Sequence, residues 1–196
     1  TYILESDRKE QDLPSIVPTE LEDRIGALVA DLVSDGDTIQ LGIGGIPNAV
    51  GMYLTKKNDL GIHTEMFTNS MMDLILSGNI TGAKKNIDTG LHVFSFAEGR
   101  ENIYEFIQNR EDCVSRRSAE HINPMTVAKQ NNFVSINTCV EIDLTGQVCS
   151  ESVGPKQISG SGGAFCCAYG AFESKGGKGI LAFPSRTAKG QSKIKS

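Results

Sequence analysis

The spacing of apolar residues changes along the chain between a helical period and a strand period. The longest helical pattern follows the capping box Thr19-Glu20-Leu21-Glu22 and continues until Gly36. Further helices are predicted over residues 49–54, 71–76, 99–109, 124–130 and 164–173. Strands are predicted over residues 38–42, 61–67, 91–96, 133–137, 140–144 and 179–183, with Thr145-Gly146 as a hairpin turn after 140–144.

Strands and helices alternate through most of this order. Such alternation is typical of an α/β layered domain, with a largely parallel sheet flanked by helices and one local hairpin. A chain of 196 residues suits one large domain, or one domain with a piece of another.

The amino-acid composition argues against several classes of protein. The chain is 39% hydrophobic and 22% charged, and its net charge of −5 argues against a nucleic-acid-binding surface. It has no run of eighteen apolar residues, so no membrane span is predicted, and its first ten residues are too charged for a signal peptide. We therefore expect a cytoplasmic protein.

The five cysteines are better explained as free thiols than as a disulfide framework or a metal site. Their number is odd, and they show neither a CxxC spacing nor paired histidines. Cys166 and Cys167 fall in a predicted helix, where buried thiols are a simpler interpretation than a redox pair. No metal is expected.

Glu65 is a candidate catalytic carboxylate because of its place at the C-terminal end of the predicted strand 61–67. In open α/β sheets ligands bind at that end of the strands. A single glutamate at a strand end is more often solvated than catalytic, so the position alone decides nothing. The neighbouring His63 is better explained as a neutral packed histidine than as an acid or base.

Two glycine clusters strengthen the interpretation of Glu65 as a catalytic residue. Gly42-Ile43-Gly44-Gly45 connects a strand to a helix, and Gly160-Ser161-Gly162-Gly163 precedes the helix 164–173. Bare amide groups at such turns favour negative charge. The first cluster lacks the full dinucleotide fingerprint GxGxxG, and no GKS/GKT follows it, so neither a Rossmann cofactor site nor a P-loop is supported there.

A carboxylate beside bare amides can act as a nucleophile on an acyl compound. The carboxylate would attack a thioester carbonyl, the amides would stabilise the oxyanion, and a reactive anhydride would form that must be shielded from water. Glu141 and Asp143 share one face of the hairpin strand, most simply as a solvated or domain-facing edge. Spacing alone does not choose between Glu65 and Glu141.

Four separated segments resemble the acetyl-CoA hydrolase/transferase family, most of all its 4-hydroxybutyrate and butyrate CoA-transferases. The resemblance runs from about Leu21 to Lys189 and rests on residues 40–50, 61–67, 77–85 and 135–148. It implies a CoA-transferase-like (NagB/RpiA-like) domain. Family members are longer, and the chain resembles their C-terminal half. Residues 1–36 would then be an opening segment and helix linking to an N-terminal domain, and residues 37–196 the C-terminal catalytic domain.

The resemblance also assigns roles. Glu65 matches the family's catalytic glutamate, which passes through acyl-anhydride and glutamyl-CoA intermediates. Gln40 and the first cluster (Gly42, Gly44, Gly45) match residues beside it, with Gln40 in the substrate pocket. The second cluster (Gly160, Gly162, Gly163) matches the loop that supplies an oxyanion amide and approaches CoA. The chain departs from the usual Gly-Gly-Gln-x-Asp-Phe after Gly163, where it has Ala164-Phe165-Cys166-Cys167.

The resemblance implies a CoA-transferase that moves CoA between a short-chain acyl-CoA (butyryl-, 4-hydroxybutyryl- or acetyl-CoA) and a carboxylate such as acetate. Coenzyme A is a substrate, and neither nucleic acid nor a membrane is an expected partner; a homo-oligomer is plausible from the family. Two alternatives remain open: an acyl-CoA hydrolase, in which water resolves the same intermediate, and a non-catalytic CoA-binding fragment that lacks its partner domain.

Overall fold

The computed structural model describes residues 4–7, 16–100 and 102–196. Its main sheet has four parallel strands in the order β12-β7-β1-β2. These are β1 (Thr38–Leu41), β2 (Gly61–Ile62), β7 (Phe133–Asn137) and β12 (Lys178–Leu181). Every residue of the two central strands β1 and β7 is buried. The predicted largely parallel α/β sheet is confirmed.

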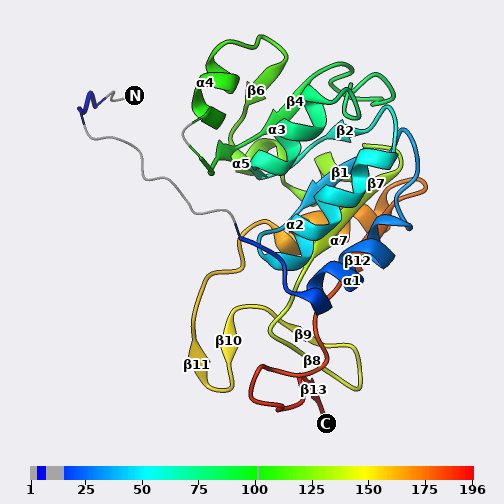
Figure 1. The fold of residues 1–196 in the computed structure, drawn as a ribbon, viewed down its shortest axis with the longest axis vertical. Helices are drawn as coiled ribbons and strands as arrows, with labels where there is room; N and C mark the ends of the chain where they lie inside the picture. Colours follow the sequence, from blue (N-terminus) through cyan, green and yellow to red (C-terminus); the bar gives the residue numbers. More distant parts are fainter. Residues whose placement is uncertain (1–3, 8–15, 101) are drawn as a thin grey trace.

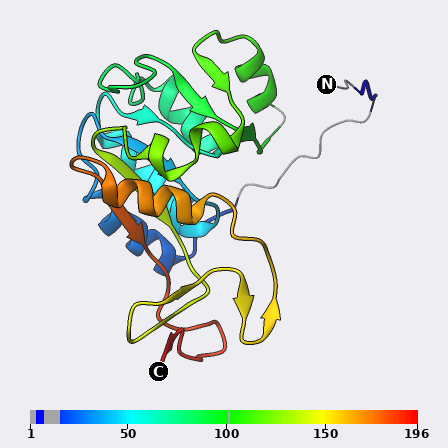
Figure 2. The same cartoon turned by 180° about the vertical axis from the view of Figure 1, so that it is seen from behind.

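Helices cover both faces of this sheet. Figures 1 and 2 show α1 (Glu20–Ala30) and α2 (Gly45–Tyr53) on one face and α7 (Ala164–Glu173) on the other. A short 3-10 helix, η1 (Leu54–Lys56), follows α2. Helices α1 and α2 pack closely against each other, because a Cβ on Gly26 of α1 would lie 2.4 Å from the Cβ of Ala49 of α2. Helix α7 packs against β7 and β12 and has the predicted bounds.

The capping box of α1 is confirmed, with the Thr19 hydroxyl and the Glu22 carboxylate each accepting from the other residue's backbone N–H. The predicted end of this helix at Gly36 is wrong. The helix stops at Ala30, and the chain then turns through a bend in which the Asp37 carboxylate accepts the Ser34 N–H at 2.8 Å.

A second group of elements extends the fold beyond β2. Strand β3 (Met66–Phe67) pairs with β5 (Phe96–Ala97), and β4 (His92–Phe94) pairs with β6 (Cys113–Ser115), all parallel. With them come α3 (Asn69–Leu76), α4 (Asn102–Gln108) and α5 (Ser118–His121), and the chain continues into α6 (Pro124–Val127), which packs against α7. The part of the opening segment at residues 1–3 and 8–15, and Glu101 before α4, lie outside the described residues.

The predicted single strand over residues 61–67 is wrong, because the chain bends between β2 and β3. After Ile62 the chain leaves β1, and His63 bridges to Val93 instead. The backbone carbonyl of Glu65 then accepts the N–H groups of both Ser95 and Phe96, at 2.9 and 3.1 Å. The change of partner breaks the strand at Glu65 and also divides the predicted strand 91–96 into β4 and β5.

Short strands after β7 build a small lobe at one end of the molecule, visible below the main sheet in Figure 1. The predicted hairpin is confirmed as β8 (Glu141–Asp143) against β9 (Val148–Cys149), and the Asp143 carboxylate accepts the backbone N–H groups of its turn. A second hairpin joins β10 (Ser152–Val153) to β11 (Lys156–Gln157). The unpredicted β13 (Ile194–Lys195) completes the lobe beside β8.

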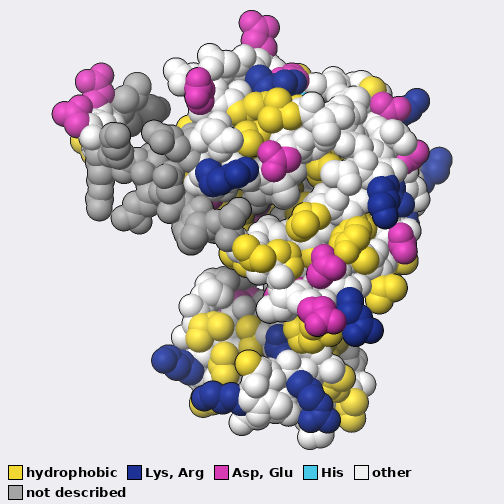
Figure 3. Space-filling model, viewed as in Figure 1, with side chains coloured by type: hydrophobic (Ala, Val, Ile, Leu, Met, Phe, Trp, Pro, Cys, Tyr) yellow, Lys and Arg dark blue, Asp and Glu magenta, His cyan; other side chains and the backbone are white. Residues whose placement is uncertain are grey.

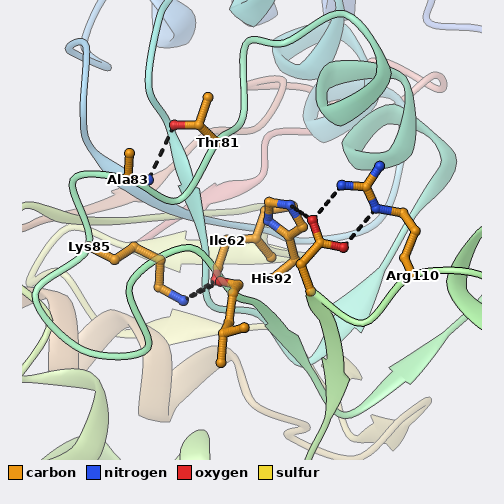
Figure 4. Close-up of polar contacts among 8 residues, drawn as sticks. Ile62, Thr81, Ala83, Lys85, His92 and Arg110 are labelled. Carbon is orange, nitrogen blue, oxygen red and sulfur yellow. Dashed lines mark hydrogen bonds and ion pairs between the residues drawn. The ribbon is translucent and has the colours of Figure 1, made fainter.

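The seam between β2 and β4 is filled by a buried lysine. Lys85 is 3% exposed, and its ammonium donates to the carbonyls of Ile62 and Leu91, at 2.9 and 2.8 Å. Nearby, His92 lies 3.4 Å from the carboxylate of Asp112, which also pairs with Arg110 (Figure 4). Burial lowers the pKa of Lys85 to about 8.

Among the described helices, none is long and apolar enough to cross a membrane.

Candidate functional site

Glu65 lies at the bend between β2 and β3, and two histidines brace the peptide before it. The Nε2 atom of His121 donates to the carbonyl of Thr64 at 2.9 Å, and the Nε2 atom of His63 donates to the carbonyl of His121 at 2.7 Å. His63 is 1% exposed, and its burial lowers its pKa to about 4. His63 is therefore the neutral packed histidine that the sequence predicts, and it positions Glu65 indirectly through His121.

The backbone N–H of Gly163 donates to Oε2 of Glu65 at 2.8 Å, across 98 positions of the sequence. Gly163 has an ordinary φ of −87°, so its glycine is not needed for backbone freedom. Space is the reason, because a Cβ there would lie 2.5 Å from Oε2 of Glu65 and 2.9 Å from a methyl of Ile122. A bare amide thus approaches the partly exposed carboxylate at the start of α7.

A cavity of about 300 Å³ opens beside this contact. It lies between the C-terminal ends of β1 and β7, the start of α7 and the small lobe. Figure 3 shows the surface hollowed where the lobe meets the rest of the molecule. The lining residues are Gln40, Leu41, Gly42, Ile43, Glu65, Met66, Phe96, Asn137, Thr138, Ser150, Ser161, Gly162, Gly163, Ala164 and Cys167.

A buried amide network forms the polar wall of this cavity. The Oε1 atom of Gln40 accepts from the Ser135 hydroxyl at 2.6 Å and from Nδ2 of Asn137 at 3.0 Å, while Nε2 of Gln40 donates to Oδ1 of Asn137 at 3.1 Å. All three side chains are less than 10% exposed. An amide nitrogen carries two N–H groups, and Nε2 of Gln40, a residue that lines the cavity, uses one of them within this network.

Sequence reasoning assigned Gln40 to the pocket but missed Ser135 and Asn137. The available signal was a pair of polar residues inside an otherwise apolar buried strand. In the parallel register Gln40 lies opposite Ser135, which places Asn137 one step further along the same face. A Cβ on Gly42 would lie 2.7 Å from Oδ1 of Asn137, so this glycine makes room for the network.

The other predicted glycines are dispersed. Gly42 lines the cavity, but its N–H donates to the carbonyl of Ile136 at 2.8 Å. Gly44, with a φ of +118°, lines a neighbouring cavity, and Gly45 packs against Glu22, whose carboxyl carbon would lie 2.4 Å from an added Cβ. Gly162 lines the Glu65 cavity with a φ of +53°, whereas Gly160 is not part of its lining.

Cys167 also lines the Glu65 cavity and is 1% exposed. Burial, and then the charge of Glu65, raise the pKa of this thiol to about 12, so it is protonated beside the carboxylate. Cys166 is only partly buried. Within the described part of the chain, no group of three or more His, Cys, Asp or Glu side chains is arranged to hold a metal ion.

Comparisons with known proteins agree with this architecture. Residues 99–196 match the model of the acetyl-CoA hydrolase/transferase C-terminal domain. The chain is 44% identical to a 4-hydroxybutyrate coenzyme A transferase of Clostridium kluyveri, over 97% of this chain and 44% of that protein. It is 41% identical to a probable butyrate:acetyl-CoA coenzyme A-transferase of Syntrophomonas wolfei, over 94% of this chain and 42% of that protein.

Solved structures give the same picture. RipA from Yersinia pestis superimposes with a TM-score of 0.88 at 40% identity, covering 94% of this chain and 42% of RipA. A 4-hydroxybutyrate CoA-transferase (abfT-2) from Porphyromonas gingivalis gives a TM-score of 0.82 at 40% identity, covering 93% and 44%. The chain therefore spans less than half the length of these relatives. The matched family model and the shared fold show that the chain belongs to the acetyl-CoA hydrolase/transferase family.

Proposed function

We propose that this chain carries the catalytic glutamate of a CoA-transferase, which moves CoA between a short-chain acyl-CoA and a carboxylate such as acetate. The observation that supports it most directly is the hydrogen bond from the Gly163 N–H to the Glu65 carboxylate, beside a cavity of about 300 Å³. The names of the related CoA-transferases supply the substrate class: 4-hydroxybutyrate, butyrate and acetyl groups.

The proposed reaction uses the Glu65 carboxylate as a nucleophile, with the backbone N–H of Gly163 beside it. The Glu65 carboxylate attacks the thioester carbonyl, the C–S bond breaks, and CoA leaves as a thiolate while an acyl-glutamyl anhydride forms. The thiolate then attacks the glutamyl carbonyl, which releases the first carboxylate and leaves a glutamyl-CoA thioester. An acceptor carboxylate reverses the sequence. No net proton transfer is required, because each step exchanges one anion for another.

The chain's own residues have distinct tasks in this scheme. The Gly163 amide holds the Glu65 carboxylate in the resting state and meets the developing oxyanion during attack; one such donor is worth about 3–4 kcal/mol in a transition state. Gln40, fixed by Ser135 and Asn137, offers an amide donor to the acceptor carboxylate. The protonated Cys167 thiol adds no second negative charge beside the nucleophile.

If water attacked the same anhydride, the chain would act as an acyl-CoA hydrolase. A related protein from Neurospora crassa, 29% identical over 64% of this chain, is named acetyl-CoA hydrolase. Transfer is our proposal because the CoA-transferases are more similar. Residues 37–196 would form the catalytic domain, after an opening segment and helix at 1–36. A cytoplasmic location and a homo-oligomer stay predictions.

The test is intact mass after mixing the protein with acetyl-CoA or butyryl-CoA, with hydroxylamine and borohydride in parallel as traps. Modification of the wild type and of Glu141→Ala, but not of Glu65→Ala, is the expected result. Glu141 is the matched control because it is a partly buried carboxylate in the lobe strand β8. An unmodified wild type, or a modified Glu65→Ala variant, overturns the proposal. Acetate that accelerates CoA transfer separates transferase from hydrolase.

A further inference from the structure

The two edges of the main sheet differ in how they are covered. At one edge both residues of β2 are buried, and the chain continues into a bridge between His63 and Val93 next to β4. At the other edge β12 pairs with β7, and no strand among the described residues lies on its outer side. The residues of β12 are exposed or half-buried, whereas every residue of β1 and β7 is buried. The outer backbone groups of β12 are therefore open to a further strand.

A charged side chain often protects such an edge from pairing with another chain. Lys178, the first residue of β12, is instead engaged within the protein. Its ammonium donates to the carbonyl of Leu32 at 2.8 Å and lies 3.5 Å from the carboxylate of Asp37, which is buried. The positive charge at this edge is thus balanced inside one chain, so two copies of the edge would repel each other little through it.

An apolar surface borders β12 on the face of the sheet that α1 covers. Leu28 of α1 and Leu32 just after it are 70% and 52% exposed. Leu28 lies on the side of α1 opposite the buried Gly26 and Ala30. The contact of Lys178 with the Leu32 carbonyl places this end of α1 beside β12.

The opposite face carries a second apolar surface, on α7 (Figure 2). Phe165, Tyr169 and Phe172 are 67%, 46% and 79% exposed, and their spacing places them on one side of the helix. Helix α7 lies directly on β12, because a Cβ on Gly179 would lie 3.2 Å from a backbone oxygen of the helix. Leu181, two residues further along β12, has the same orientation and is 39% exposed.

Together these six side chains are large enough for a stable contact. At roughly 200 Å² for a fully exposed large side chain, their exposed fractions amount to roughly 700 Å² on each copy. The largest apolar patch on a typical monomer is about 300–600 Å². A standard protein interface buries about 800 Å² per partner. The six residues are Leu28, Leu32, Phe165, Tyr169, Phe172 and Leu181.

We propose that β12 pairs antiparallel with β12 of a second copy of this chain, about a twofold axis through this edge of the sheet. The two sheets then continue into each other, α1 packs against α1 of the copy on one face, and α7 packs against α7 on the other. One symmetry operation thus covers the strand edge and both apolar surfaces. A single helix or an extended peptide would cover only one of these three parts. None of the six side chains lines either cavity, so the dimer does not need the Glu65 site.

The experiment is sedimentation velocity of the full chain over about 1–100 μM. The wild type should dimerise reversibly. Leu28→Glu and Phe172→Glu should each weaken the dimer at least about a hundredfold, because each brings like charges together across the axis. Leu76→Glu is the matched control, a leucine 65% exposed on α3 and outside this surface. It should dimerise like the wild type, and circular dichroism checks that every variant folds.

Mixing Leu28→Glu with Leu28→Lys should restore the dimer, because opposite charges then meet across the twofold axis. A monomeric wild type at about 100 μM, a dimer that survives Leu28→Glu or Phe172→Glu, or a mixture that stays monomeric overturns the proposal. Labelling of Glu65 by acyl-CoA should be the same in all these variants. The dimer and the covalent function therefore fail separately, since one is measured by sedimentation and the other by mass.

Discussion

Two polar clusters lie close together in this fold and differ in how their charged group is held. The Lys85 ammonium is 3% exposed and donates to two backbone carbonyls, with the His92-Asp112-Arg110 chain beside it. The Glu65 carboxylate is partly exposed, accepts the Gly163 amide and lines a cavity. The charge of Lys85 is enclosed by protein groups, whereas that of Glu65 faces open space.

The comparison teaches that burial and polarity alone do not identify a site. A buried cation with backbone partners ties β2 to the segment before β4 and so stabilises the sheet. A carboxylate that retains unused acceptor capacity next to a cavity can attack or bind a ligand. If this distinction is correct, changes around Glu65 should alter chemistry at little cost to folding, and changes around Lys85 should do the reverse.

The largest expected effect comes from Gly163→Ala. The new Cβ would lie 2.5 Å from Oε2 of Glu65, so the carboxylate must move and the amide hydrogen bond is lost. We expect acylation of Glu65, measured by intact mass over time, to slow by about a hundredfold, the effect of one lost oxyanion donor. The melting temperature should fall only modestly, because the closest contact is with the partly exposed Glu65 side chain, although the Cβ would also lie 2.9 Å from a methyl of the buried Ile122.

Gly160→Ala is the control for this change, three residues away in the same loop. A Cβ on Gly160 meets no heavy atom within 4 Å, and its acylation rate should stay near that of the wild type. Equal rates for the two alanine variants would contradict the role of Gly163.

The second prediction concerns the Lys85 cluster. Lys85→Met leaves the buried carbonyls of Ile62 and Leu91 without their donor, and an unsatisfied group costs about 1–3 kcal/mol. We expect the free energy of unfolding, measured by urea titration, to fall by about 3 kcal/mol, with acylation per folded molecule unchanged. Lys84→Met, an exposed neighbour, should stay within about 0.5 kcal/mol. A stable Lys85→Met variant that has lost acylation would reverse the comparison.

Much of the fold follows from local pattern. The capping box at Thr19, the bounds of α7 and the hairpin turn at Thr145-Gly146 each depend on residues close in sequence, and the structure confirms them. The pattern did not reveal the bend at Glu65, because that bend arises from pairing with Val93, Ser95 and Phe96, about thirty residues further along. Strand β13 was not predicted for the same reason, since its partner β8 lies about fifty residues earlier in the sequence.

The candidate site was predictable in its parts but not in its assembly. Sequence reasoning singled out Glu65, Gln40 and both glycine clusters, and the structure brings Glu65, Gln40, Gly42, Gly162 and Gly163 around one cavity. It could not tell that Gly45 makes room for Glu22 of α1, or that Gly163 makes room for Glu65 itself. The sequence alone does not show whether a glycine is needed because another group approaches it closely or because the backbone turns there.

The smallest predicted effect compares one histidine from each cluster. Burial lowers the pKa of His63 and of His92 to about 4, from 6.5 in the unfolded chain. Between pH 6.5 and pH 4 the unfolded state therefore binds protons that the folded state does not, and stability falls as the pH falls. Each histidine should cost about 1.4 kcal/mol per pH unit in this window, or about 2 kcal/mol at pH 5.

Either His63→Gln or His92→Gln should lower the slope of unfolding free energy against pH by about one proton, measured by urea titration from pH 7.5 to 4.5. Only His63→Gln should also slow acylation of Glu65, since His63 supports His121 and thereby the Thr64 carbonyl. Glutamine retains an N–H near the position of Nε2, so the slowing should be modest, about twofold to fivefold by analogy with other positioning contacts. A pH slope that neither substitution changes would show that these histidines are already protonated in the folded protein. Slowing by His92→Gln as well would show that the two clusters form one coupled unit.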